Sequence, residues 1–231
     1  MNLIECKDLS KTYGKTTALD HITLSLESGR IVGLVGPNGS GKTTLIKLIE
    51  HVLVPSSGEI LVEGMAPGKD TKRLVSYLPD RDFLPEDMRL ETLLDMFVDF
   101  FDDFNRAKAE EMIKSLGIQK SQRLKKMSKG TREKVQLILT MSRDAHIYLL
   151  DEPIAGVDPA TRDYILNTIV GNYNENALVL ISTHLIADVE KVLDEVVFLK
   201  EGQVYLHRNA DDLRTEKGMS IDSYFREVFK C

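Results

Sequence analysis

The sequence has no tryptophan, and aromatic residues make up only 6% of its 231 positions. Its two cysteines, Cys6 and Cys231, are too few for a disulfide framework and fit a reducing compartment. The longest apolar runs, such as residues 177–181, fall far short of the ~20 residues that a membrane-spanning helix needs. The charged N-terminal stretch is not typical of a signal peptide. If the protein acts at a membrane, we expect another chain to supply the spanning helices.

Positive charge is not in excess either. The chain has 30 Lys and Arg against 36 Asp and Glu, which gives a formal net charge of -6. This balance disfavours a general attraction to nucleic acid or anionic lipid, so we expect no nucleic-acid partner. Internal repeats and low-complexity tracts are absent from the sequence, and 42% of its residues are hydrophobic. That content is sufficient for one large domain, or for one domain with an inserted lobe.

Short apolar runs alternate with helical patterns, which favours an α/β fold. The most apolar runs predict parallel strands buried on both faces, at residues 31–35, 147–150, 177–182 and 196–199. Near the N-terminus, LIECKDLSKTY and ITLSLE alternate between apolar and polar residues. That alternation predicts antiparallel strands with one solvated face.

The middle of the chain, from about residue 82 to 142, has a helical pattern and no convincing strand. We predict helices at residues 90–101, 105–116 and 128–142. Further on, Asp158 and Pro159 predict the start of another helix, with the aspartate as N-cap. The pattern thus predicts an α/β core that is interrupted by a helical lobe and then resumed. The alternative is one compact α/β domain with a few long helices.

A phosphate-binding loop is indicated by residues 36–43, GPNGSGKT, which match the pattern G-x-x-x-x-G-K-[ST]. Glycines let the backbone wrap closely around a phosphate, and the amides of residues 38–44 can point at its oxygens. We expect Lys42 to reach the β- and γ-phosphates and the Thr43 hydroxyl to bind Mg²⁺. An apolar strand precedes the loop, and an amphipathic helix at residues 44–52 follows it, as the motif requires.

Two acids end the apolar run at residues 147–150. Sites in parallel α/β sheets form at the carboxyl ends of strands. There Asp151 can hold Mg²⁺, and Glu152 can polarise an attacking water as general base. Taken alone, the pair favours two solvated acids at a strand end, but a phosphate-binding loop in the same chain favours the catalytic interpretation.

With these motifs the chain resembles the ABC ATPase family over essentially its whole length. The resemblance implies that Tyr13 stacks on adenine and that Met127–Thr131 (MSKGT) is the signature motif, opening a helix toward the partner's ATP. It also implies a dimer-contacting D-loop at residues 155–158 and a switch histidine, His184, at the γ-phosphate. The nucleotide-binding residues it implies are Tyr13, Gly36, Asn38, Gly39, Ser40, Gly41, Lys42, Thr43, Thr44, Ser128, Gly130 and Asp158. Without the family, Tyr13 would be strand packing, Ser128 a helix cap and His184 a surface residue.

Two departures from the family pattern stand out. The usual signature is Leu-Ser-Gly-Gly-Gln, whereas this chain keeps only Ser128 and Gly130 and places Lys129 in the first helical turn. A cation there opposes the helix dipole, so either the partner's ATP compensates it or the lysine is simply solvated. The family's glutamine after the strand at residues 75–78 is replaced by Asp80, which we expect to be a third metal-site residue with Thr43 and Asp151. The variant signature is similar to a subgroup of bacterial exporters, some linked to peptide antibiotics.

The resemblance implies a single ABC ATPase domain with a P-loop NTPase core and a mostly parallel sheet. Residues 1–80 and 143–231 would form the RecA-like core with an N-terminal antiparallel β subdomain, and residues 81–142 an inserted α-helical subdomain. ATP and Mg²⁺ are the implied cofactors, with Glu152, His184 and Lys42 as catalytic residues. The implied partners are transmembrane permease subunits and a second ATPase, identical or homologous, in an ATP-dependent head-to-tail dimer. The expected location is cytoplasmic, on the inner face of the plasma membrane. A soluble ABC protein acting on ribosomes or DNA, and a nucleotide switch with negligible turnover, are the alternatives.

Overall fold

A computed structural model describes residues 1–229, so Cys231 lies outside the described part of the chain. Its first sheet is antiparallel and follows the strand order β2-β1-β4. These strands are β1 (Asn2–Tyr13), β2 (Thr16–Glu27) and β4 (Ser57–Val62). Buried and exposed residues alternate along β2, which confirms the predicted antiparallel strands with one solvated face.

The second sheet has six strands in the order β5-β6-β7-β3-β8-β9. These are β5 (Val75–Leu78), β6 (Ile147–Asp151), β7 (Leu178–Thr183), β3 (Arg30–Val35), β8 (Glu195–Lys200) and β9 (Gln203–Asn209). The first five run parallel, and β9 pairs antiparallel with β8. The predicted mostly parallel sheet is therefore confirmed. Strands β4 and β9 were not predicted, because neither forms a buried apolar run: β4 has two buried residues and β9 has none.

Helices cover the sheets in two groups, apart from those of the middle segment. Helix α1 (Lys42–Ile49) lies between the two sheets, near the short helix α2 (Thr71–Leu74). The other group comprises α6 (Pro159–Asn172), α7 (Ile186–Val189), α8 (Ala210–Lys217) and α9 (Ile221–Phe229). The predicted cap of α6 is confirmed: Asp158 accepts a hydrogen bond from the Thr161 amide, and Pro159 is the first helical residue.

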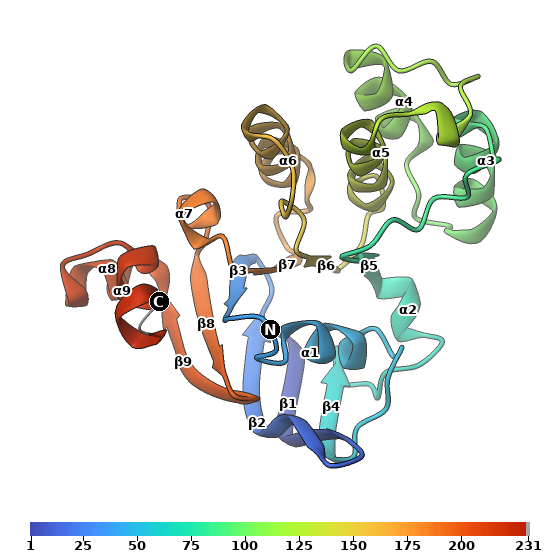
Figure 1. Cartoon of the computed structure of the whole chain (residues 1–231). Helices are drawn as coiled ribbons and strands as arrows, with labels where there is room; N and C mark the ends of the chain where they lie inside the picture. The colour runs from blue at the N-terminus through green and yellow to red at the C-terminus, as the bar shows by residue number, and fades with distance from the viewer. Residues whose placement is uncertain (230–231) are drawn as a thin grey trace.

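We refer to residues 81–142 as the helical subdomain, which stands apart from the sheets in Figure 1. It contains α3 (Leu90–Phe100), α4 (Arg106–Ser115), a 3-10 turn (Leu124–Lys126) and α5 (Lys129–Met141). Its apolar side chains form a separate core, which runs in sequence from Leu84 to Leu139. The three helices predicted for this region are confirmed to within about two residues at each end.

Arg143 joins the helical subdomain to the second sheet. Only 4% of this residue is exposed. Its guanidinium donates to both carboxylate oxygens of Asp103 and to the carbonyls of Arg73 and Val75, and it lies 4.1 Å from the centre of the Phe101 ring. A buried charge that is fully paired in this way holds its partners at fixed positions. The end of α5 is therefore fastened to the strand that leads to Asp80.

Across residues 1–229, no helix combines the length and the apolar character needed to span a membrane.

Candidate nucleotide-binding site

The loop between β3 and α1 is packed so closely that two of its glycines have no substitute. A Cβ on Gly36 would lie 2.4 Å from the Leu199 carbonyl oxygen. A Cβ on Gly41 would lie 2.5 Å from the Ala18 carbonyl oxygen, and Gly41 also has a φ of 108°. Neither position has room for a Cβ, and the left-handed backbone of Gly41 also favours glycine. The loop is thereby held close to the start of α1, where a helix N-terminus is suited to binding an anion.

Lys42, the first residue of α1, is almost completely buried in this loop. Its Nζ atom donates to the carbonyls of Gly36 at 2.8 Å and Pro37 at 3.2 Å. It also lies 3.6 Å from Oε1 of Glu152. Burial lowers the pKa of Lys42, and the carboxylates of Glu152 and Asp151 oppose that effect. The ammonium group is thus held ready at the position where a phosphate would enter.

The carboxylate of Asp151 faces the loop from the end of β6. Its Oδ1 atom accepts hydrogen bonds from Thr43 Oγ1 at 3.1 Å and from Ser182 Oγ at 2.5 Å. Its Oδ2 atom is buried and makes no hydrogen bond within the described structure. Burial is the main cause that raises the pKa of Asp151, and the charges of Asp80 and Glu152 add to it. A buried oxygen without a donor, beside a threonine hydroxyl, fits a Mg²⁺ ion that would also bind phosphate oxygens.

Glu152 has a strained backbone, with a φ of 51° that glutamate rarely adopts. Its amide is fixed by Ser182, whose carbonyl and hydroxyl oxygens both lie at 3.1 Å. Its carboxylate accepts a hydrogen bond from His184 Nδ1 at 3.0 Å, so the ring presents its Nε2 atom elsewhere. Among the non-glycine residues predicted for the site, Glu152 alone has a positive φ, and its carboxylate lies close to Lys42 and His184.

A cavity of about 350 Å³ lies in front of these groups. It is lined by residues of the loop and by the two acids at strand ends: Ala18, Asn38, Gly39, Gly41, Lys42, Thr43, Thr44, Asp80 and Glu152. The structure therefore brings together the predicted loop, Asp80 and Glu152. Gly36 and Ser40 do not line the cavity; they pack against each other within the loop, where Ser40 is 3% exposed.

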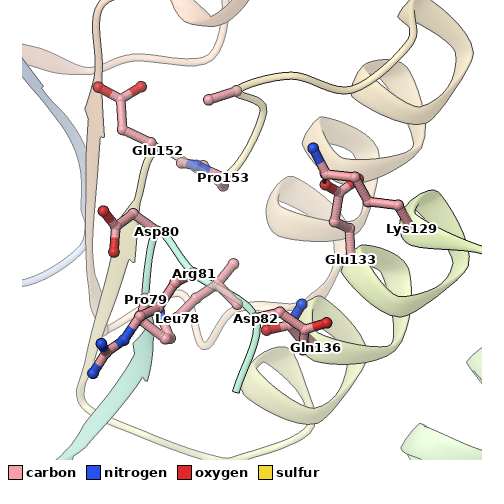
Figure 2. Close-up of a pocket in the computed structure, with 11 residues that line it drawn as sticks. Leu78, Pro79, Asp80, Arg81, Asp82, Lys129, Glu133, Gln136, Glu152 and Pro153 are labelled. Atoms are coloured by element: carbon pink, nitrogen blue, oxygen red, sulfur yellow. Dashed lines mark ion pairs between the residues drawn. The ribbon is translucent and has the colours of Figure 1, made fainter. Parts of the chain in front are cut away.

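A second, smaller pocket of about 140 Å³ shares Asp80 and Glu152 with the first. Figure 2 shows it between the segment that follows β5 and the first turns of α5, so it separates the core from the helical subdomain.

Asp151 and His184 do not line this cavity, but they bond Thr43 and Glu152 in its lining. Four other predicted residues lie away from it. Tyr13 is 47% exposed at the end of β1, with the Lys11 ammonium 5.4 Å from its ring centre. Ser128 caps α5 by accepting from the Thr131 amide at 3.2 Å, and Asp158 caps α6. Gly130 lies in the first turn of α5, where a Cβ would meet only Thr161 Oγ1, at 4.0 Å. Packing within the chain therefore does not require a glycine at position 130.

Ser182 is the site residue that the sequence did not reveal as functional. It pairs with Asp151 across β6 and β7, and its side chain bonds both Asp151 and the amide of Glu152. The available signal was a serine at the end of an otherwise apolar strand. Ala18, whose carbonyl touches the loop at Gly41, offered no signal of its own.

A glycine loop between strand and helix, a buried lysine, a threonine–aspartate pair and a glutamate at a strand end define a P-loop nucleoside triphosphatase. The sequence model of the ABC transporter family matches residues 19–155, more than half of the chain. The chain belongs to this family of ATP-binding, ATP-hydrolysing cassettes.

Known relatives agree with that assignment. The chain is 29% identical to the ABC-type transporter ATP-binding protein EcsA of Bacillus subtilis, over 100% of this chain and 98% of that protein. It is 27% identical to the SkfA peptide export ATP-binding protein SkfE of the same organism, over 88% of each. A solved structure, the ATP-binding subunit of an ABC transporter, has a TM-score of 0.86 and 30% identity and covers 98% of this chain and 99% of its own.

Proposed function

We propose that the protein is the ATP-hydrolysing subunit that powers a separate transmembrane permease, and that the permease is an exporter. The observation that carries the proposal is that Lys42 and Glu152 line one cavity beside the phosphate-binding loop, while the buried Asp151 bonds Thr43 in its lining. The name of the similar protein SkfE, a peptide export ATP-binding protein, supports the exporter assignment. In this arrangement the protein lies in the cytoplasm, against the inner face of the membrane.

In the proposed reaction, ATP places its phosphates along the loop, where backbone amides and Lys42 bind them. Thr43, Asp151 and Asp80 would hold Mg²⁺, which would neutralise the phosphate charge. Glu152 accepts a proton from the attacking water, since its carboxylate is fixed by His184 at 3.0 Å. His184 keeps Nε2 for the γ-phosphate. Tyr13 would contact the adenine ring, because it is the exposed aromatic at the end of β1.

The same proposal includes a head-to-tail dimer, with itself or with a homologous ATPase. Ser128, Gly130 and Asp158 lie outside the cavity of their own chain, so their proposed roles need a partner's nucleotide. The glycine at position 130 supports this, because no contact within residues 1–229 excludes a side chain there. An open first turn of α5 lets its amides approach a phosphate of the other subunit.

The test of the permease assignment is co-purification. The tagged protein is isolated from its own cells with mild detergent, and the bound proteins are identified by mass spectrometry. We expect an integral membrane protein in stoichiometric amount. Recovery with ribosomes, or with DNA, in place of a membrane protein would contradict the proposal and favour a soluble ABC protein. Phosphate release that stays at background in the isolated complex would favour a nucleotide switch.

The role of Asp80 at the metal is a separate prediction. Its carboxylate lines the nucleotide cavity with Glu152, and its charge acts on the buried Asp151 beside that cavity. The three acids repel phosphates when no metal neutralises them. We expect that Asp80→Gln makes ATPase activity less dependent on Mg²⁺, with little change in melting temperature. Mg²⁺ is titrated at saturating ATP in both proteins. Superimposable activity curves would show that Asp80 does not act at the metal.

A further inference from the structure

The two departures from the family pattern lie on opposite walls of one pocket. Asp80, which stands in place of glutamine, and Lys129, which stands in place of glycine, both line the 140 Å³ pocket between the core and the helical subdomain. Figure 2 shows Asp80 and Glu152 on one side and Lys129 and Glu133 on the other. The two replacements have opposite charge, although 48 intervening residues separate them in the sequence.

Lys129 has no strong partner in this conformation. Its side chain is 79% exposed, and its Nζ lies 3.8 Å from Glu133 one turn further along α5. An exposed pair of this kind contributes little to stability. Helix α5 has no acidic residue in its first turn, so the lysine there opposes the helix dipole without local compensation. The local structure of α5 therefore does not explain a lysine at this position.

The lysine already reaches the core across the pocket. A Cβ built on Gly156 would lie 3.5 Å from Lys129 Nζ, so the ammonium group lies against the segment that follows Glu152. On the facing wall, Asp80 makes no hydrogen bond or ion pair within residues 1–229. Its charge adds to the burial that raises the pKa of the neighbouring Asp151. Each group is thus an exposed charge with at most a weak ion pair in this conformation, and the two face each other across a small pocket.

We propose that Lys129 is a positioning residue that pairs with Asp80 of its own chain when the helical subdomain closes on the core. The pair neutralises the carboxylate that replaces glutamine. Closure around a nucleotide therefore needs a lower Mg²⁺ concentration than it would with an unpaired Asp80. The charges of the two replacements, Asp80 and Lys129, then compensate each other. This inference rests on the nucleotide-binding role proposed above, but it needs neither the permease nor the second subunit.

The experiment follows closure in the monomer with spin labels. Lys114→Cys in the helical subdomain and Glu59→Cys in β4 provide exposed labelling sites, and Cys231→Ser removes a competing thiol. Burial raises the pKa of the Cys6 thiol to about 12, so Cys6 resists labelling. The distance between the labels is measured by double electron–electron resonance. Mg²⁺ is titrated with a saturating non-hydrolysable ATP analogue, at a protein concentration at which sedimentation shows monomers.

A double-mutant cycle compares four proteins: the parent, Lys129→Gln, Asp80→Gln and the double variant. We expect Lys129→Gln to raise the Mg²⁺ concentration for half-maximal closure about fivefold, as for loss of one partly exposed ion pair. In the Asp80→Gln background, the same substitution should change that concentration by less than about twofold, the limit of non-additivity for independent sites. Lys126→Gln, which removes an exposed charge three residues earlier, is the matched control and should leave the midpoint unchanged.

Two results would overturn the pairing. An equal shift in both backgrounds would show that Lys129 acts by general electrostatics or through another group, such as the partner's nucleotide. An unchanged midpoint in Lys129→Gln would show that the lysine is only solvated. Binding of the analogue is measured in the same samples. If the parent does not bind it, the nucleotide-binding proposal fails together with this one, whereas normal binding without coupling overturns the pairing alone.

Discussion

Glu152→Gln should bind ATP normally but hydrolyse it at least ~100-fold more slowly than the unchanged protein, because an amide cannot accept the proton of the attacking water. The carboxylate lies between Lys42, 3.6 Å away, and His184, 3.0 Å away, and glutamine fills the same space. Nucleotide should therefore stay bound, and a dimer should accumulate in ATP. Phosphate release and size-exclusion chromatography measure the two effects.

Glu175→Gln is the matched control, since it makes the same substitution at an exposed glutamate outside the lining of the nucleotide cavity. It should hydrolyse ATP at the rate of the unchanged protein. If Glu152→Gln also kept that rate, Glu152 would not be the general base, and the neighbouring carboxylates would have to be tested in turn.

Lys42→Ala should weaken ATP binding by roughly 10- to 100-fold, the range expected when charge-assisted hydrogen bonds to a phosphate are lost. The lysine is also the cation nearest to Glu152 in the cavity, so its removal leaves the acids facing the phosphates without compensation. Affinity is measured by titration with a fluorescent ATP analogue in the presence of Mg²⁺.

Lys47→Ala provides the control for the change in charge and side-chain length. Lys47 lies in the last turn of the same helix, at the end away from the loop. We expect its affinity for the analogue to remain that of the unchanged protein. Tight binding by Lys42→Ala would contradict the assignment of the phosphate-binding loop, whereas a similar loss in both variants would indicate damage to the helix.

Contiguous motifs made much of the site predictable. The phosphate-binding loop needs glycines at fixed spacing, and the contacts at Gly36 and Gly41 show why each has no substitute. The acids at the end of β6 followed from an apolar run that stops abruptly. Asp158 and Pro159 carry their own local signal for the start of a helix, which the cap of α6 confirms. In each case the physical cause acts within a few neighbouring residues.

Contacts that depend on strand register could not be predicted from the sequence. Ser182 reaches Asp151 only because β7 pairs with β6 in one register, and no local pattern specifies that register. The placement of Lys129 opposite Asp80 likewise depends on the orientation of the helical subdomain relative to the sheet. Tyr13 remains a prediction, since it lies outside the lining of the nucleotide cavity.

The joint at Arg143 has a mechanical consequence for the far end of the same helix. Helix α5 runs from Lys129, at the pocket, to Met141, just before the joint, and its 13 residues span about 20 Å. Because Arg143, just beyond that end, donates to two carbonyls of the core, a rotation about that fulcrum displaces the other end the most. Turning a lever of that length by about 10–15° moves its tip by roughly 3–5 Å. A slight tilt at the anchored end is thus amplified into a shift of several ångströms at Lys129, on the pocket wall that faces Asp80.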